Sequence, residues 1–358
     1  MQAVSRFRRA FPPPNFLSTP GAGIDISSGS VRSIVFSNMN VGHPSISSRK
    51  VALPKNVVVD GEIEKPDTVV EFLRSFRLRE GIQFAHASLP EKKAFLYQTV
   101  IPRTGQGMRS AVESTLEEHV PIPPSEASFD FEIVRSVEGG DVVSVTVYAT
   151  RIIEQYYDVF ERAGITLLSL EVESHAIARA LVPEKEDKVS LVVDFGKETM
   201  RLVVLDSGVA SFTTTVEVGG DTLTKAVMKH YEVSEQEAET IKNEKGFLGG
   251  GEHKDLYETL MTTVSVVRDE IAGHILFWNS PTEAQVIDHK PITEIIMIGG
   301  NANLKGLPEF LARALDIPVR IGNVWGGALS FDEYIPPLSF HESLEYGTAI
   351  GLALRSNA

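Results

Sequence analysis

Two short segments of the chain share one pattern of apolar and polar positions. In the first, an apolar run over 23–26 is followed by a Ser/Gly turn at 27–30 and a β-prone run over 31–36. In the second, the run 191–196 leads through a short polar turn into the apolar run 200–205. Two β-prone runs separated by a short turn are typical of a hairpin. The pattern therefore predicts two β-hairpins.

Each predicted hairpin carries an aspartate near the end of its first strand, Asp25 in one and Asp194 in the other. These two residues lie 169 positions apart, a spacing too long for a solenoid repeat. In both segments an apolar residue and then a small one follow the aspartate. We interpret this as a loose internal duplication, which predicts two related α/β halves.

The rest of the chain alternates between helical and strand periodicity. Helical spacing predicts amphipathic helices, the first with an N-terminal cap, over 64–80, 108–119, 152–163, 221–245, 255–278, 307–315 and 345–354. Strand patterns cover 84–101, 129–135, 142–150, 165–171 and 295–298. Residues 86–170 are thus predicted to form a compact unit of about four strands and two helices. The glycine-rich stretch 248–254 predicts a mobile loop, and small residues on one face of the last helix permit close backbone approach.

The composition is that of a protein that buries a core. Its 358 residues are 42% hydrophobic and 23% charged, which suits two domains and excludes wholesale disorder. A net charge of −14 disfavours sequence-independent binding to nucleic acid. The absence of cysteine excludes disulfides, thiolate catalysis and cysteine-ligated metal centres. Since no run approaches the roughly 18 apolar residues of a membrane span, we expect a cytoplasmic protein without one.

Residues 1–20 are basic and contain three consecutive prolines. We predict a flexible tail. The alternative is a short basic segment with phenylalanines that contacts an anionic membrane or a partner.

The two hairpins have the chemistry to hold a nucleotide from both sides. Backbone N–H groups of a Ser/Gly turn can point at phosphate oxygens, and an aspartate can hold the waters around Mg²⁺. The strand 295–298 leads directly into Gly299 and Gly300, where a flat base could lie against the main chain. One hairpin alone would be ordinary turn chemistry, whereas two hairpins and a later strand–Gly-Gly are more specific. The sequence contains no P-loop, GxGxxG or HExxH motif.

This order of motifs resembles that of the actin/Hsp70/hexokinase ATPase superfamily over nearly the whole chain. Within the superfamily, the chain resembles the PilM family of type IV pilus assembly proteins, to which the cell-division protein FtsA is related. The resemblance is carried by GIDISSGSVRSIVF, LEVESHAIARAL, VVDFGKETMRLVV, VEVGGDTLTKAV, IIMIGGNANLKGL and EYGTAIGLAL.

The resemblance implies an α/β, actin-like ATPase fold: two duplicated RNase H-like halves, an inserted subdomain of the 1C type, and ATP in the cleft between the halves. After the tail 1–20, the implied boundaries place subdomain 1A at 21–85, 169–188 and 335–358, and subdomain 1C at 86–168. Subdomain 2A takes 189–219 and 290–334, and subdomain 2B takes 220–289.

The resemblance also implies roles for single residues. Asp25 and Asp194 would organise Mg²⁺ and the attacking water, and Glu173 would orient that water. The implied cofactor-binding residues are Ser27, Ser28, Gly29, Ser30, Arg32, Gly196, Thr199, Gly219, Gly220, Glu239, Lys242, Gly299, Gly300 and Asn301. Plainer roles stay open for some: Glu173 as a helix N-terminal cap, Glu239 with Lys242 as a solvated ion pair, and His175 as a packed or capping residue.

The chain departs from the family pattern at both turns. Arg32 stands where the superfamily uses a lysine, Ser27 where the family commonly has glycine, and Lys197-Glu198 where small residues are usual. The Glu198 carboxylate beside the terminal phosphate would oppose its charge, with Lys197 as a possible offset. We therefore expect nucleotide binding with slow turnover.

The implied function is that of a cytoplasmic ATP-binding scaffold in the type IV pilus inner-membrane assembly platform, held at the membrane through partners. Its partners would be the N-terminal cytoplasmic peptide of a PilN-like single-span membrane protein and other platform proteins. We expect the peptide in a groove beside the inserted unit 86–168, whose alternative role is a stabilising appendage.

Two other functions remain open from the sequence. One is an FtsA-like filament-forming membrane tether, which the end of the chain directly after the last predicted helix argues against. The other is a small-molecule kinase, for which the sequence nominates no catalytic base. Whether the machine is a pilus, a competence or a secretion system also stays open.

Overall fold

The computed structural model describes residues 21–37, 45–103, 107–182, 187–248, 254–280, 290–329, 331–332 and 334–355. The predicted tail 1–20 and nearly all of the predicted loop 248–254 lie outside the described residues. In the part of the chain that is described, no helix is both long and apolar enough to cross a membrane.

The first hairpin is the centre of a five-stranded sheet. Its strands are β1 (Ala22–Ile26), β2 (Ser30–Ser37), β3 (Ser45–Ala52), β6 (Phe84–Leu89) and β10 (Thr166–Val172). Their spatial order is β10-β6-β1-β2-β3. The hairpin strands and β3 run antiparallel, whereas β6 pairs parallel with both β1 and β10.

The second hairpin is the centre of a sheet with the same plan. It contains β11 (Val189–Phe195), β12 (Met200–Asp206), β13 (Val209–Val216), β14 (Ile292–Ile298) and β15 (Val319–Ile321) in the order β13-β12-β11-β14-β15. Again the first three strands are antiparallel and the last two are parallel to β11. The two sheets match strand for strand, so the duplication predicted from the two aspartates is confirmed.

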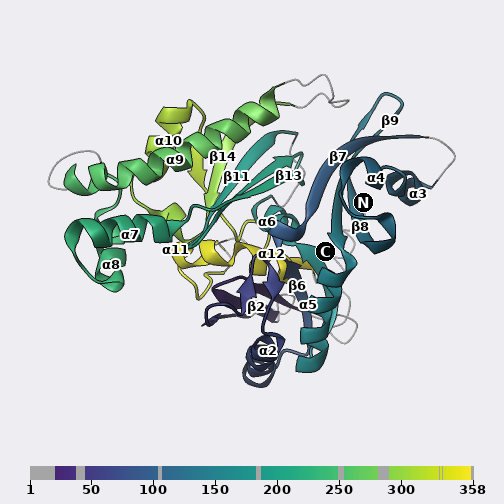
Figure 1. Ribbon diagram of the computed structural model, residues 1–358, viewed down its shortest axis with the longest axis horizontal. Helices are drawn as coiled ribbons and strands as arrows, with labels where there is room; N and C mark the ends of the chain where they lie inside the picture. The colour runs from purple at the N-terminus through teal and green to yellow at the C-terminus, as the bar shows by residue number, and fades with distance from the viewer. Residues whose placement is uncertain are drawn as a thin grey trace.

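Helices cover the two sheets and fill the space between them (Figure 1). Beside the first sheet lie α2 (Pro66–Glu80) and α5 (Thr150–Ala163), and with the second pack α7 (Gly220–Tyr231), α8 (Glu235–Lys245), α9 (Lys254–Asn279) and α10 (Leu307–Leu315). Two largely buried helices, α6 (Glu173–Leu181) and α12 (Gly347–Leu354), pack against each other in the middle of the molecule. The described chain also contains short elements: β4 (Val58–Val59), β5 (Glu62–Ile63), η2 (Glu91–Lys93), η3 (Pro124–Glu126), η5 (Gly300–Asn303), α11 (Phe340–Ser343) and η6 (Leu344–Tyr346).

Glycines allow the close approach that was predicted for the last helix. A Cβ added at Gly351 of α12 would lie 1.8 Å from the carbonyl oxygen of Ala176 in α6, and one added at Gly23 of β1 would lie 1.9 Å from that of Ala349. No larger residue fits at either position without moving a backbone. The small-residue face of α12 therefore brings two helices and the first hairpin into direct contact.

The inserted unit is smaller than predicted. It consists of β7 (Phe95–Pro102), β8 (Ala127–Val137) and β9 (Gly140–Ala149) in the order β7-β9-β8, with α3 (Met108–Glu113) and α4 (Leu116–His119) on one face. The prediction of one unit over 86–170 was wrong at both ends, because β6 and β10 pair inside the first sheet and α5 packs into the core of the first half. The subdomain boundaries implied by the resemblance remain predictions.

Local side chains explain two smaller differences from the predicted helices. The helix expected over 108–119 divides because the hydroxyls of Ser114 and Thr115 donate to the carbonyl oxygens of Ala111 and Val112, at 2.7 and 2.8 Å. Helix α2 starts with Pro66 at its first position, and its N-cap residue makes no capping hydrogen bond with its side chain.

The insert also contacts the second half of the molecule. Strands β7 and β9 lie beside β13, and the Ser144 hydroxyl of β9 donates to the Ala210 carbonyl of β13 at 2.7 Å. Arg135 of β8 forms an ion pair with Asp206, whose side chain is buried where β12 ends. The insert is thus fastened to both halves.

Candidate functional site: a cleft between two hairpin turns

A cavity of about 740 Å³ lies where the two hairpins face each other. Every site residue predicted from the sequence lines it, with the exception of Gly219. The predicted residues thus lie around one cavity, and their roles toward a ligand remain predictions. Seven further lining residues with charged side chains were not among the predicted site residues; they are Lys50, Lys197, Glu198, Arg201, Asp221, Glu235 and Glu345.

The first turn keeps its outer side open. The backbone N–H and the hydroxyl of Ser27 both donate to the carbonyl oxygen of Ser30, at 2.9 and 3.0 Å. The Ser27 side chain thus closes its own turn. At Gly29, nothing lies within 4 Å of the position where a Cβ would stand. The turn therefore has free space on the side that faces the cavity.

The internal duplication extends to an Asp–Arg pair in each hairpin. Asp25 lies opposite Arg32 in the register of β1 and β2, and Asp194 lies opposite Arg201 in that of β11 and β12. The Arg32 Nη1 to Asp25 Oδ2 distance is 3.4 Å, and the corresponding distance from Arg201 to Asp194 is 3.0 Å. Both halves thus place a carboxylate and a guanidinium on the cleft.

The arginine of the first hairpin is held by carboxylates from two directions. Besides Asp25, it approaches Glu345 of η6 with 3.7 Å between Nη2 and Oε2. Glu345 also pairs with Lys50 of β3. Asp25 in turn accepts a hydrogen bond from the Ser88 hydroxyl at 2.9 Å. This network ties the chain before α12 to the first hairpin.

Glu173 lies in a buried cluster behind the second hairpin. Its Oε2 is 2.6 Å from Arg201 Nη2 and accepts the backbone N–H of Glu91 at 3.0 Å. Glu91, a buried residue that sequence reasoning missed, accepts the N–H of Ser174 at 2.9 Å. Burial, together with the charges of Asp25 and Glu91, raises the pKa of Glu173 to about 8 despite the nearby arginine. Glu173 is thus both an anchor of α6 and a lining residue of the cavity.

Asp194 and Asp25 are close enough to influence each other. Burial raises the pKa of Asp194, and Asp25 and Glu345 add to this effect, while Arg201 and Arg32 oppose it. Because both carboxylates line the same cavity, we expect them to attract a cation.

The donor set of the cavity fits Mg²⁺ bound together with phosphates. Among the described residues, no group of three or more His, Asp or Glu side chains is arranged to hold a metal ion by itself. Mg²⁺ in nucleotide sites usually keeps several waters and needs one or two carboxylates plus the phosphates. Asp25 and Asp194 supply such a pair of carboxylates.

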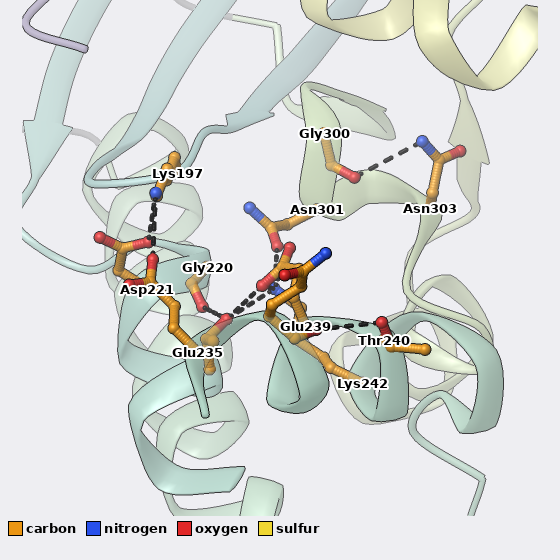
Figure 2. Close-up of polar contacts among 12 residues, drawn as sticks. Lys197, Gly220, Asp221, Glu235, Glu239, Thr240, Lys242, Gly300, Asn301 and Asn303 are labelled. Atoms are coloured by element: carbon orange, nitrogen blue, oxygen red, sulfur yellow. Dashed lines mark hydrogen bonds and ion pairs between the residues drawn. The ribbon is translucent and has the colours of Figure 1, made fainter. Parts of the chain in front are cut away.

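The second half contributes a cluster of hydrogen-bonded polar side chains around a buried lysine (Figure 2). Lys242 of α8 is 1% exposed, and its Nζ lies 2.9–3.0 Å from both Glu239 carboxylate oxygens, 3.0 Å from Thr224 Oγ1 and 3.1 Å from Asn301 Oδ1. Glu239 and Lys242 are therefore not a solvated pair. Burial raises the pKa of Glu239, but hydrogen bonds from Thr224 and Lys242 outweigh it, so that the pKa is lowered overall.

Asn301 connects this cluster to the second turn. Its Nδ2 donates to the carbonyl oxygen of Gly196 at 2.8 Å. Gly299, at the end of β14, has φ +86°, and a Cβ there would lie 2.6 Å from Asp194 Oδ1. Only glycine fits at this bend, and its lack of a side chain lets the Gly-Gly turn pass close to the Asp194 carboxylate.

The two glycines at the start of α7 pack against the second turn. A Cβ at Gly219 would lie 2.4 Å from the backbone of Lys197 and Glu198, and one at Gly220 would collide with the amide of Asn301. The N–H of Gly220 donates to the Gly196 carbonyl at 3.0 Å. Gly219 thus lies behind the turn, and any effect of it on a ligand would be indirect.

His175 is half-buried on α6, and its Nε2 lies 3.4 Å from Thr146 Oγ1 of the insert. It is a packed residue at the junction of α6 and the inserted sheet, and it is not among the residues that line the cavity.

Comparison with known proteins decides the family. Residues 23–357 match the family of the type IV pilus assembly protein PilM. The chain belongs to this family. Among solved structures, this PilM-family chain is similar to the PilM–PilN type IV pilus biogenesis complex, with a TM-score of 0.76 and 19% identity over 95% of this chain and 99% of that one.

More distant similarities show the fold alone. The ethanolamine utilization protein EutJ from Carboxydothermus hydrogenoformans has a TM-score of 0.54 at 18% identity, covering 95% of this chain and 93% of that one. MreB5 of Spiroplasma citri bound to ADP has a TM-score of 0.54 at 14% identity, covering 92% and 94%. The family and the actin-like fold expected from the motifs are therefore confirmed.

A curated relative matches in part. The cell division protein FtsA of Neisseria meningitidis serogroup B is 24% identical over 200 residues, which are 50% of this chain and 47% of that protein. The match thus spans about half the length of this relative. The relation of the PilM-family chain to FtsA, expected from the motifs, is confirmed at the level of sequence.

Proposed function

We propose that this PilM-family chain binds a nucleotide with Mg²⁺ in the cleft and serves as a cytoplasmic scaffold of type IV pilus assembly. One observation carries the nucleotide part: two hairpin turns and a Gly-Gly turn, far apart in sequence, line a single cavity of about 740 Å³. The likeness of the fold to MreB5 of Spiroplasma citri, solved with bound ADP, supports it.

Each half of the molecule would bind a different part of the nucleotide. The first turn, residues 27–30, offers backbone N–H groups and hydroxyls to the β-phosphate, and Arg32 supplies positive charge beside it. The Gly-Gly turn at 299–300 receives the base. The Glu239 carboxylate contacts Lys242 and also lines the cavity, so that it would accept hydrogen bonds from the ribose hydroxyls.

The charge of the cavity supports the requirement for Mg²⁺. Among its described lining residues are eight carboxylates and five basic side chains. A polyphosphate adds more negative charge, and Mg²⁺ neutralises such charge by bridging phosphate oxygens. Asp25 and Asp194 would hold the waters of the ion, and Arg201 keeps Asp194 in place.

Calorimetry tests the nucleotide proposal. ADP or ATP with Mg²⁺ should release heat on titration into the full chain, and Asp194→Ala should weaken binding far more than Glu239→Ala. Removing Mg²⁺ with a chelator should also weaken binding. Folded protein that gives no heat with either nucleotide at high micromolar concentration would contradict the proposal.

For the partner, we propose the N-terminal cytoplasmic peptide of a PilN-like membrane protein, which would hold the chain at the inner membrane together with other platform proteins. The similarity to the solved PilM–PilN complex supports this. The inserted sheet offers a place: among the strands of the described residues, β8 stands at the edge of this sheet, next to β9. An extended peptide can add to such an edge through backbone hydrogen bonds. Ile133 of β8 is 44% exposed and could contact an apolar side chain of the peptide.

Fluorescence anisotropy with a labelled peptide of this kind tests the docking strand. Ile133→Asp should weaken binding about tenfold or more, and moderate salt should have little effect because backbone hydrogen bonds dominate. Leu78→Asp is the matched control, since Leu78 is 79% exposed on α2, away from the insert. Equal affinity of the two variants and the unaltered chain would place the peptide elsewhere.

A further inference from the structure

A direct hydrogen bond joins the two turns across the cleft. The Ser28 hydroxyl in the first turn donates to Glu198 Oε2 in the second at 2.5 Å, although the residues are 170 positions apart. Both residues are exposed, and both line the cavity. Glu198 is therefore a carboxylate at the open side of the cleft, where the two halves meet.

The charge of Glu198 is not balanced by its neighbour. Lys197, expected from the sequence to offset it, lies with its Nζ 3.4 Å from Glu235 and 3.7 Å from Asp221 (Figure 2). The other basic side chains of the cavity pair with other carboxylates; they are Arg32, Lys50, Arg201 and Lys242. Within the described parts of the chain, none of the ion pairs includes Glu198.

The position of Glu198 matters if the nucleotide lies as proposed above, and the inference rests on that proposal. A base at Gly299–Gly300 and a β-phosphate in the first turn leave the gap between Ser28 and Glu198 as the next place along the phosphate chain. A diphosphate would end at the first turn, where Gly29 leaves open space. A triphosphate would insert its terminal group between the turns, break the Ser28–Glu198 bond and approach an unbalanced carboxylate.

We propose that Glu198 is a specificity-determining residue that makes this cleft prefer nucleoside diphosphates to triphosphates. Placing like charges side by side in a binding site disfavours the wrong ligand. We expect the diphosphate to bind at least about tenfold more tightly, which corresponds to about 1.4 kcal/mol. The preference belongs to the charge of Glu198 and not to the hydrogen bond itself.

Calorimetric titration of the full chain with ADP and with ATP, each with Mg²⁺, measures the preference. Glu198→Gln removes the charge and keeps an oxygen that can accept from Ser28. It should raise the affinity for ATP about tenfold and leave that for ADP unchanged. Glu235→Gln is the matched control: it also removes an exposed carboxylate of the same cavity, but one paired with Lys197, and should leave the ratio of the two affinities as it is.

The outcomes separate this inference from the proposal beneath it. If ADP binds but ATP binds equally well, or if Glu198→Gln leaves the ratio unchanged, the role of Glu198 is refuted while nucleotide binding stands. If neither nucleotide binds, the proposed nucleotide function fails, and the inference fails with it.

Discussion

The close contact between α6 and α12 requires glycine at position 351. A Cβ at this position would lie 1.8 Å from the carbonyl oxygen of Ala176, whereas real Cβ atoms essentially never come within 3.0 Å of another heavy atom. In Gly351→Ala the two helices would have to separate by about 1.2 Å in a packed interior, which resists such changes. Because both helices are largely buried between the two sheets, the strain cannot be relieved at the surface.

The expected cost follows from two opposing effects. Overpacking of a core costs about 1–3 kcal/mol and sometimes more, and a backbone obstacle places this site at the upper end. Alanine recovers about 1 kcal/mol through its better helix propensity. We therefore expect Gly351→Ala to lower the free energy of unfolding by about 2 kcal/mol or more.

The chain offers a matched control in Gly273, an exposed glycine within α9. Nothing lies within 4 Å of its Cβ position, so Gly273→Ala should stabilise the protein by up to about 1 kcal/mol. Urea titrations followed by circular dichroism compare the two variants with the unaltered chain. Opposite shifts of the unfolding midpoint are expected. A Gly351→Ala variant as stable as the unaltered chain would refute the close-contact account of the helix pair.

Three further results are expected. Hydrolysis of ATP should be far slower than the ~1–10³ s⁻¹ of dedicated enzymes; turnover at tens per second that Asp25→Ala abolishes would contradict this. Because burial raises the pKa of Glu173 from 4.5 to about 8, its contribution to stability is complete below the lower value and is lost as pH rises through the higher one. Glu173→Gln should flatten this decline in urea titrations, and an unchanged slope would count against the shift. Lys242→Ala leaves the Asn301 amide oxygen without its buried donor and should lower the free energy of unfolding by about 1–2 kcal/mol, because the half-exposed Glu239 carboxylate can turn to water. The exposed Lys229→Ala should cost almost nothing, as thermal melting can measure.

Much of the fold and of the site could be predicted because its signals are local. Asp25 and Asp194 sit between an apolar run and a turn within a few residues, and Gly299 directly follows a buried strand. Such short patterns report hairpins and tight turns without knowledge of distant partners. The duplication then followed from the repetition of the same local pattern.

The features that were missed depend on partners far away in the sequence. Arg201 looks like an ordinary polar position on a strand until the register sets it opposite Asp194 and the fold brings Glu173 to it. Likewise, β6 and β10 look like part of the insert until they pair in the first sheet. The matching spacing of Asp25 to Arg32 and Asp194 to Arg201 was a signal that could have identified Arg201.

The central claim is that two turns and a Gly-Gly turn form a single nucleotide site. Hydrogen–deuterium exchange of the full chain, with and without saturating ADP and Mg²⁺, tests it most directly. The backbone amides of residues 27–30, 196–199 and 299–301 should be protected together, because one ligand would contact all three segments. Protection confined to one half of the molecule, or none in any of the three, would contradict the claim.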